Sequence, residues 1–528
     1  MNKGYVAMLL HSHMPYVRHP EKEDSLEERW LFEGISECYL PMIQGYEKLV
    51  EENIDFMITM SITPTLMSML LDPYLNKRYK NYLKLSIELS EKEIIRTRDD
   101  KELNKVAYFY HERLKSLYFT YKSYDYNIMN AFKRFDNLGV LEIITSSATH
   151  GLLPLLDVNI ETVKAQLYQG FNHYSKSLGH DPKGIWLPEC AYNYSLDNIL
   201  KELGLKYFIM EGKGVTMATP KPIYGTNAPI RTEGGVYAFG RDEESSKQVW
   251  SSFIGYPGDW DYREFYRDIG YELPLDYIEP YIDKSGIRID TGIKYYRITN
   301  KSDHKEYYNR ERAMEKVKNH SMHFLNSRRC QIEEISKNMN KPPIILCPYD
   351  TELFGHWWFE GPDFIYNFIK DSYRENVNYK LVTPSYYLEN YTEAEVCKPN
   401  PSTWGENGDY SVWINPSNDW MYRHLHFAAR KMINLANTYS DPTELEERAL
   451  NQAARELMLA ESSDWPFIIK NNTTAEYASE RVNTHINRFN ELYNAITKEN
   501  IDESYLEDIE KMDNIFPDID FRIYRSNK

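Results

Sequence analysis

Two carboxylates, Glu189 and Asp350, each follow a short apolar run and each have aromatic neighbours. Trp186 lies just before Glu189, whereas Trp357 and Trp358 follow Asp350. Apolar aromatic surroundings raise the pKa of a carboxyl group, which a general acid near neutral pH requires. Two such carboxylates on different strands, with aromatic rings for the flat faces of sugars, are typical of a glycosidase. The pattern therefore predicts carbohydrate chemistry, with Glu189 and Asp350 as catalytic residues.

Both residues also have structural interpretations. Glu189 is compatible with the start of a helix or an ion pair, and Asp350 with the N-cap of an aromatic core helix. A non-catalytic glucan-binding protein would keep the aromatic residues but would hold the two carboxylates too far apart to act together.

A second motif, His11-Ser12-His13, ends the first apolar run, so both imidazoles are expected on one side of the strand. This spacing is compatible with a metal-dependent hydrolase, because two such rings can ligate zinc. No C-x-x-C pair or convincing third ligand accompanies it. We therefore expect the histidines to bind substrate, and we predict no metal and no cofactor; the metal-dependent hydrolase remains an alternative.

Tryptophan is concentrated late in the chain, where six of the ten lie between residues 357 and 465. Trp404 and Trp413 fall in a stretch rich in Gly and Asn, which favours a cleft over a packed helix. Together with Trp357 they are predicted to contact substrate. His150 and Asp464 are further polar candidates at the ends of predicted elements.

Seven or eight short, continuously apolar runs carry these polar residues at their ends. Such runs predict strands buried on both faces, as in a parallel α/β sheet or barrel. In a (β/α) barrel the catalytic residues lie at the carboxyl ends of the strands. We expect an α/β fold in which residues 1–395 form the catalytic barrel.

Two regions interrupt or follow this pattern. Residues 73–137 are charged and amphipathic and predict long inserted helices, and a small inserted domain is expected at about 188–230. Residues 396–528 are expected to form a helical C-terminal bundle that contributes tryptophans to the cleft. One of its helices is predicted to have Asp441 as N-cap and Pro442 at the first helical position.

Charge and composition limit the classes of partner. The 528 residues include 79 acidic and 62 basic side chains, which gives a net charge of −17. This balance argues against nucleic-acid binding and against docking on an anionic membrane. The five cysteines are scattered, and the N-terminal apolar run is too short for a signal peptide. We expect a cytoplasmic protein; the sequence does not give its oligomeric state.

Four segments together resemble glycoside hydrolase family 57, in particular its α-1,4-glucan branching enzymes and amylase relatives. They are residues 11–15, 186–190, 349–358 and 461–465. The resemblance covers essentially the whole chain. It implies an incomplete (β/α)7 barrel with inserted helical segments and a helical C-terminal domain that closes the cleft.

The resemblance also implies residue roles. Glu189 would be the nucleophile and Asp350 the general acid/base. The implied subsite residues are His11, His13, His150, Trp404, Trp413 and Asp464. Tyr237, within residues 225–243, is the candidate for the loop tyrosine that excludes water in branching members, although it is equally compatible with a strand.

The expected reaction acts on α-1,4-glucans such as amylose, glycogen and maltooligosaccharides. A covalent glucosyl-enzyme would form on Glu189, and transfer to a glucan 6-hydroxyl would give an α-1,6 branch. Transfer to water would instead give an α-amylase, which the sequence leaves open. A retaining pair predicts carboxyl groups about 5–5.5 Å apart.

Overall fold

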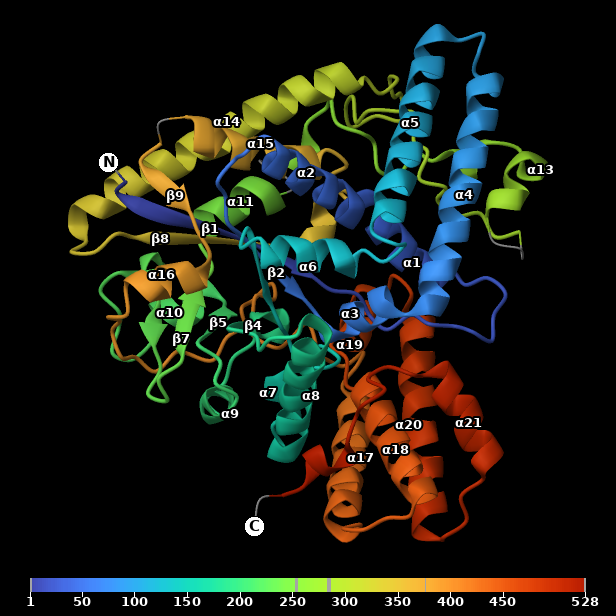
Figure 1. Ribbon diagram of the computed structural model, residues 1–528, viewed down its shortest axis with the longest axis vertical. Coiled ribbons are helices and arrows are strands. Elements are labelled where there is room, and N and C mark those ends of the chain that lie inside the picture. Colours follow the sequence, from blue (N-terminus) through green and yellow to red (C-terminus); the bar gives the residue numbers. More distant parts are fainter. Residues whose placement is uncertain (1, 252–254, 283–285, 376, 527–528) are drawn as a thin grey trace.

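The computed structural model describes residues 2–251, 255–282, 286–375 and 377–526 (Figure 1). Short strands gather on one side of the molecule and helices surround them. Within the described residues the strands are β1 (Gly4–Ser12), β2 (Ile58–Ile62), β3 (Leu141–Ile144), β4 (Gly184–Trp186), β5 (Tyr207–Met210), β6 (Ile230–Arg231), β7 (Tyr237–Gly240), β8 (Ile344–Asp350) and β9 (Tyr379–Leu381).

These strands form two sheets. The first has the order β3-β2-β1-β8, with β9 also paired to β1, and all its pairings are parallel. The second has the order β4-β5-β7-β6, in which only β6 is antiparallel. Eight strands, all except β6, therefore share one direction, and their carboxyl ends can meet at one end of the molecule.

The two sheets are joined by short contacts. An isolated parallel bridge between Thr145 and Ile185 connects the end of β3 to β4. On the other side, Asp242 N donates a hydrogen bond of 3.0 Å to Leu346 O of β8. The expected α/β class is thus confirmed, with the eight parallel strands arranged as two sheets linked by these single contacts.

Burial explains the apolar character of the strands. Every residue of β1 is buried, and β8 is buried except for its last residue, Asp350. A strand covered on both faces needs apolar side chains on both, which removes the alternation of a half-exposed strand.

Helices follow or interrupt the strands. In the first half they are α1 (Leu26–Gly34), α2 (Leu40–Glu51), α3 (Pro64–Leu71), α4 (Pro73–Arg96), α5 (Lys101–Ser123), α6 (Met129–Asn137), α7 (Leu153–Leu156), α8 (Ile160–Leu178), α9 (Leu196–Glu202), α10 (Gly212–Thr216) and α11 (Glu243–Trp250). Later helices are α12 (Ile269–Glu272), α13 (Leu275–Ile278), α14 (Arg310–Ile335), α15 (Gly361–Arg374) and α16 (Pro384–Asn390). A π-helical turn, Ile35–Tyr39, joins α1 to α2.

The inserted helices α4 and α5 pack against each other and extend away from the sheets (Figure 1). Each begins with an aspartate N-cap. Asp72 accepts hydrogen bonds from the amides of Tyr74 and Leu75, and Asp100 accepts from those of Glu102 and Leu103. These bonds satisfy amides that a helix start leaves free and explain why both helices begin there.

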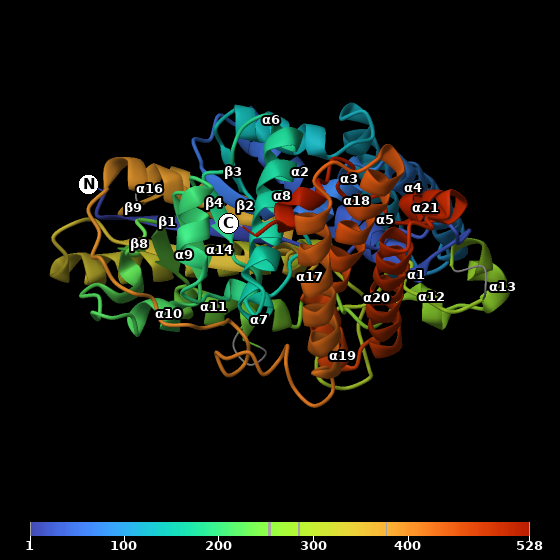
Figure 2. The same ribbon diagram turned by 90° about the horizontal axis from the view of Figure 1, so that it is seen from below.

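The C-terminal helices form a bundle whose members are α17 (Trp420–Thr438), α18 (Glu444–Ala460), α19 (Asp464–Asn471), α20 (Ala475–Thr497) and α21 (Glu503–Met512). α17 packs on α8 and so attaches the bundle to the sheet region (Figure 2). The expected cap at Asp441 is wrong. Thr443 caps α18 in a capping box with Glu446, whose carboxylate accepts from Thr443 N, and Pro442 precedes the helix.

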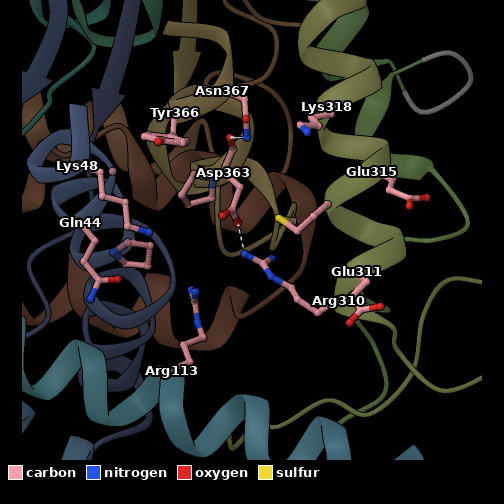
Figure 3. A pocket seen from close by; sticks show the side chains of 14 residues that line it. Gln44, Lys48, Arg113, Arg310, Glu311, Glu315, Lys318, Asp363, Tyr366 and Asn367 are labelled. Carbon is pink, nitrogen blue, oxygen red and sulfur yellow. Dashed lines mark hydrogen bonds and ion pairs between the residues drawn. The ribbon is translucent and has the colours of Figure 1, made fainter. Parts of the chain in front are cut away.

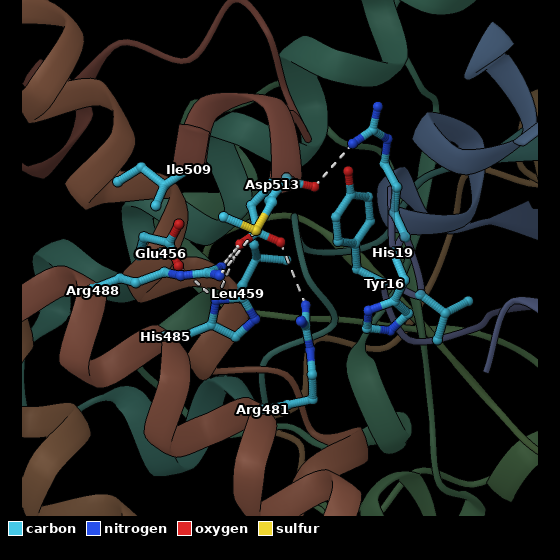
Figure 4. A network of polar contacts seen from close by, with 12 residues as sticks. Tyr16, His19, Glu456, Leu459, Arg481, His485, Arg488, Ile509 and Asp513 are labelled. Carbon is cyan, nitrogen blue, oxygen red and sulfur yellow. Dashed lines mark hydrogen bonds and ion pairs between the residues drawn. The ribbon is translucent and has the colours of Figure 1, made fainter. Parts of the chain in front are cut away.

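A buried polar network lies inside the bundle (Figure 4). His485 Nδ1 contacts Glu456 Oε2 at 2.6 Å, and Asp513 forms ion pairs with Arg481 and Arg488. The two arginines compensate the buried carboxylates.

Across the described residues, no helix combines the length and apolar character that crossing a bilayer requires.

Candidate active site

The polar residues predicted to do chemistry meet at the carboxyl ends of the parallel strands. The register of β1 places His11 beside Ser61 of β2 and beside Asp350 of β8. Glu189 follows β4 directly, and Arg241 follows β7. One edge of the strand arrangement therefore carries imidazole, carboxylate and guanidinium groups together.

Glu189 has an unusual backbone. It lies in the helical turn Pro188–Cys190 with φ at +58°, and Cys190 follows with φ at +50°. His150 also has a positive φ, +57°. This conformation is costly for residues other than glycine, and such strain concentrates at functional sites. Two of the predicted site residues are thus held in backbone conformations that the surrounding structure must enforce.

Two donors from the C-terminal part of the chain fix the Glu189 carboxylate. Trp404 Nε1 donates to Oε2 at 2.8 Å, and Ser463 Oγ donates to Oε1 at 2.9 Å. Burial raises the pKa of Glu189, and these two hydrogen bonds oppose that rise by stabilising the ionised form. The side chain keeps 13 % of its exposure, so the carboxylate is open to a ligand.

Three histidines stack beside it. The ring centroids of His13 and His150 are 3.9 Å apart, and those of His11 and His150 are 5.1 Å apart. His13 Nδ1 contacts Thr63 Oγ1 at 3.0 Å and its Nε2 contacts Asp464. Burial lowers the pKa of His13, but the Asp464 carboxylate and the charges of Glu189 and Glu352 together raise it, and the net shift is upward.

His11 and His150 complete a hydrogen-bonded chain that ends at Glu189. Polar contacts of 2.9–3.1 Å join Ser61 Oγ to His11 Nδ1, His11 Nε2 to His150 Nε2, and His150 Nδ1 to Ser463 Oγ. If Glu189 accepts from Ser463, one proton order satisfies every member: each group donates toward Glu189. Burial lowers the pKa of both histidines well below the usual value, which agrees with neutral rings. All ring nitrogens of the three histidines have protein partners, which disfavours the metal-hydrolase alternative.

Asp350 is the last residue of β8 and the only one of that strand that is not fully buried. Burial raises its pKa well above the usual value, and the charges of Glu352 and Glu189 raise it further, against the opposing charge of Arg241. A carboxyl group in this environment holds its proton near neutral pH and can donate it. Asp350 and Glu189 thus lie close enough for the charge of one to affect the other.

Several residues that contact the site were not predicted from the sequence. Ser463 lies inside the 461–465 segment, where only its neighbour Asp464 was singled out. Glu352 follows Asp350 by two residues, accepts a short hydrogen bond from the Tyr39 hydroxyl, and has a pKa raised by burial to about 7. Tyr39 ends the π-helical turn, and no signal in the sequence connects it to Glu352.

A further pair, noted at strand ends but not predicted as site residues, is Arg241 and Glu211, whose side chains form an ion pair of 2.8 Å. The Arg241 guanidinium also lies 5.9 Å from the centre of the Trp404 ring. Their positions after two apolar runs were the available signal, because each directly follows a predicted strand.

The other predicted residues make no polar contact with this group of side chains among the described residues. Trp357 is 55 % exposed and stacks on Phe265 with ring centroids 4.4 Å apart. Trp413 is only 1 % exposed and packs with Leu152 and Ala191, and its Nε1 has no hydrogen-bond partner among the described residues. Tyr237 is the first residue of β7, at the amino end of the strand, where its hydroxyl donates to Thr392 O. The structure therefore brings together Glu189, Asp350, His11, His13, His150, Trp404 and Asp464, but not Tyr237.

Comparison with known proteins adds sequence evidence. Residues 7–330 match the family model of glycosyl hydrolase family 57, and residues 424–524 match that of the 1,4-alpha-glucan branching enzyme C-terminal region. A 1,4-alpha-glucan branching enzyme of Thermococcus kodakarensis is 34 % identical over 97 % of this chain and 77 % of its own.

Solved structures agree. The alpha-amylase AmyC from Thermotoga maritima is 43 % identical, with a TM-score of 0.94 and full coverage of both chains. A GH57-type branching enzyme from Pyrococcus horikoshii is 34 % identical, with a TM-score of 0.89, and the match covers 100 % of this chain and 97 % of that one. By the extent of the family-model match and by the identity to these relatives, the chain belongs to glycosyl hydrolase family 57.

Proposed function

We propose that this protein is a retaining 1,4-α-glucan branching enzyme with Glu189 as nucleophile and Asp350 as general acid/base. The observation that carries the proposal is the position of the Glu189 carboxylate. It is fixed by Trp404 Nε1 and Ser463 Oγ at the same strand ends as Asp350, whose raised pKa suits a proton donor.

In the first step Asp350 gives its proton to the glycosidic oxygen while a Glu189 oxygen attacks the anomeric carbon. The carbon–oxygen bond to the leaving glucan breaks, and a covalent glucosyl ester forms on Glu189. The two hydrogen bonds to Glu189 aim its carboxylate, and a retaining reaction requires about 5–5.5 Å between the two carboxyl groups.

In the second step ionised Asp350 removes the proton from an acceptor hydroxyl, and the acceptor oxygen displaces Glu189 from the anomeric carbon. A glucan 6-hydroxyl as acceptor gives an α-1,6 branch, and water gives hydrolysis. The two carboxylates act identically in both cases, so the outcome depends on acceptor binding and on exclusion of water.

The match of residues 424–524 to the branching-enzyme C-terminal model supports transfer. This region follows Trp404 and includes Ser463 and Asp464, which contact Glu189 and His13. The second candidate is an α-amylase of the same family, and the 43 % identity to AmyC supports it. The α-glucan substrate is common to both candidates.

Incubation with amylose separates the two. Proton NMR counts new α-1,6 linkages, and a reducing-end assay counts hydrolysis. A branching enzyme gives α-1,6 linkages in excess of new reducing ends, whereas an amylase gives reducing ends without branches. The Glu189→Gln variant serves as a control and should give neither product. If this variant kept both activities, the assignment of the nucleophile would be contradicted.

A further inference from the structure

A surface cavity of about 420 Å³ lies between α2, α5, α14 and α15, formed by residues that have no role in the site described above (Figure 3). Its basic members are Lys48 of α2, Arg113 of α5, and Arg310 and Lys318 of α14. The cavity is large enough for a small organic ligand.

Arg113 is the unusual member of this group. Its guanidinium lies 4.6 Å from the centre of the Phe359 ring, and its Nη2 atom is buried without a hydrogen-bond partner among the described residues. Burial and the positive charges of Arg310 and Arg263 lower the pKa of Arg113, and the carboxylates of Asp363 and Glu37 compensate this only in part. A half-buried guanidinium with a buried, unpartnered nitrogen and a charge that is only partly compensated favours the binding of an anion.

Arg310 is only partly satisfied. Its Nη2 donates to Asp363 Oδ2 at 2.8 Å. Its Nη1 is buried and, like Nη2 of Arg113, has no hydrogen-bond partner among the described residues. Figure 3 shows both guanidinium groups directed into the cavity from opposite helices. The carboxylate of Asp363 is thus already used, and the other acidic lining residues, Glu311 and Glu315, are exposed on α14.

We propose that this cavity is a binding site for a phosphate monoester, held between the guanidinium groups of Arg113 and Arg310. Guanidinium groups present planar pairs of donors that match phosphate oxygens. Lys48 and Lys318 add positive charge at the rim, and Gln44 and Asn367 add polar groups for the body that carries the phosphate. The site is separate from the glucan reaction and does not depend on the proposed function.

The test measures thermal unfolding of the full chain with inorganic phosphate, glucose 6-phosphate, glucose or chloride, at constant ionic strength. Both phosphate compounds should raise Tm saturably, by about 2 °C at one hundred times Kd, relative to chloride. A larger effect of glucose 6-phosphate than of phosphate identifies a phosphorylated sugar, and equal effects identify free phosphate. No shift beyond chloride, or the same shift with glucose as with glucose 6-phosphate, overturns the proposal.

Arg113→Met links any shift to this cavity. Methionine keeps the contact with Phe359 and removes the charge, so the phosphate-induced shift should disappear while Tm without ligand stays equal to or above that of the wild type. Arg423→Met, at an exposed position of α17, is the control and should keep the shift. A shift that persists in Arg113→Met overturns the proposal.

Calorimetric titration of the wild type with glucose 6-phosphate provides a measurement that needs no variant. Saturable binding of one ligand per chain supports the site. Heats equal to those of dilution count against it.

Discussion

Glu189 is positioned by two hydrogen bonds, one to each carboxylate oxygen, and both oxygens can accept them fully only when the carboxyl group is ionised. Trp404 Nε1 can only donate, and Ser463 is connected through His150 and His11 so that its hydroxyl hydrogen is directed to Glu189. These hydrogen bonds counteract the effect of burial on the pKa. The proposed nucleophile and the proposed acid are therefore distinguished by their partners: Glu189 has two hydrogen-bond donors, and the pKa of Asp350 is raised further by the charges of Glu352 and Glu189.

Glu189→Gln should lower kcat by at least about 10³-fold on amylose, because an amide cannot form the covalent intermediate. The fold should persist, since the amide oxygen still accepts from Trp404 and Ser463 can accept from the amide nitrogen. Initial-rate assays and a thermal melt test this. Glu406→Gln, at an exposed position two residues after Trp404, is the matched control and should retain activity. Near-normal activity of Glu189→Gln would refute the role.

Ser463→Ala should raise the pKa of Glu189, because a hydrogen bond to the ionised carboxylate is lost. The nucleophile must be ionised, so the acidic limb of the kcat/KM profile should move to higher pH. The loss of one such bond, about 1–2 kcal/mol, corresponds to a roughly 10-fold fall in kcat. The pH profiles of the wild type and of Ser123→Ala, an exposed position on α5, provide the comparison. An unshifted acidic limb would contradict the hydrogen-bond order.

At the scale of elements, the turn between α18 and α19 does as much for the site as the strand ends do. Ser463 ends this turn and Asp464 begins α19, and they contact Glu189, which follows β4, and His13, which follows β1. The turn after β8 is held in a similar way, because Tyr39 of the π-helical turn bonds to Glu352. Single π-helical turns between α-helices are common at functional sites. The residues at the strand ends are thus contacted by the helical bundle, through Ser463 and Asp464, and by the α1–α2 connection, through Tyr39.

Asp464→Asn should weaken the attachment of this turn to β1 in a pH-dependent way. Asp464 raises the pKa of His13 above its unfolded value, so the pair stabilises the folded state below about pH 6.5 and this contribution is lost as the pH rises through the folded pKa. The variant should therefore lower Tm more at pH 6 than at pH 9.

Asp136→Asn is the control for this prediction. Asp136 contacts His180 at 2.8 Å, but that histidine is 46 % exposed, and an exposed pair contributes less than about 1 kcal/mol. The Tm loss should be smaller than for Asp464→Asn at pH 6. An equal loss at both pH values for Asp464→Asn would show that the charge of His13 does not contribute.

At the scale of the whole molecule, side chains of the types that can ligate a metal gather in two places among the described residues. These are the three stacked histidines and the Glu456–His485–Asp513 cluster of the bundle. In both places, other side chains of the protein already pair with the groups that a metal ion would need. Ring nitrogens bond to Ser61, Thr63, Ser463 and Asp464 in the first, and Arg481 and Arg488 pair with Asp513 in the second (Figure 4).

Dialysis against EDTA should therefore leave both Tm and activity on amylose unchanged, within about 1 °C and about 20 %. The measurement compares dialysed enzyme with the same enzyme after addition of Zn²⁺ or Ca²⁺. Activity lost on dialysis and restored by one cation would revive the metal-dependent alternative.

The sequence by itself determined where the reactive groups lie on their strands. Continuous apolar runs identify strands buried on both faces, and the polar residue after each run is placed at a carboxyl end whatever the surroundings. This is why the positions of Glu189, Asp350, His11 and His13 at or just after strand ends could be predicted. Local signals were weaker at helix starts, where Thr443 rather than Asp441 caps α18.

Only the tertiary structure decided which partners these groups have. Glu189 and its donor Ser463 are 274 residues apart, and Glu352 and Tyr39 are 313 apart. Their contacts depend on how the bundle and the π-helical turn pack against the strands. The same packing buried Trp413, exposed Trp357 and placed Tyr237 at the far end of β7, although all three are aromatic residues in suggestive contexts. A local pattern specifies the direction and burial of an element, whereas contacts across hundreds of residues arise only when the elements pack together.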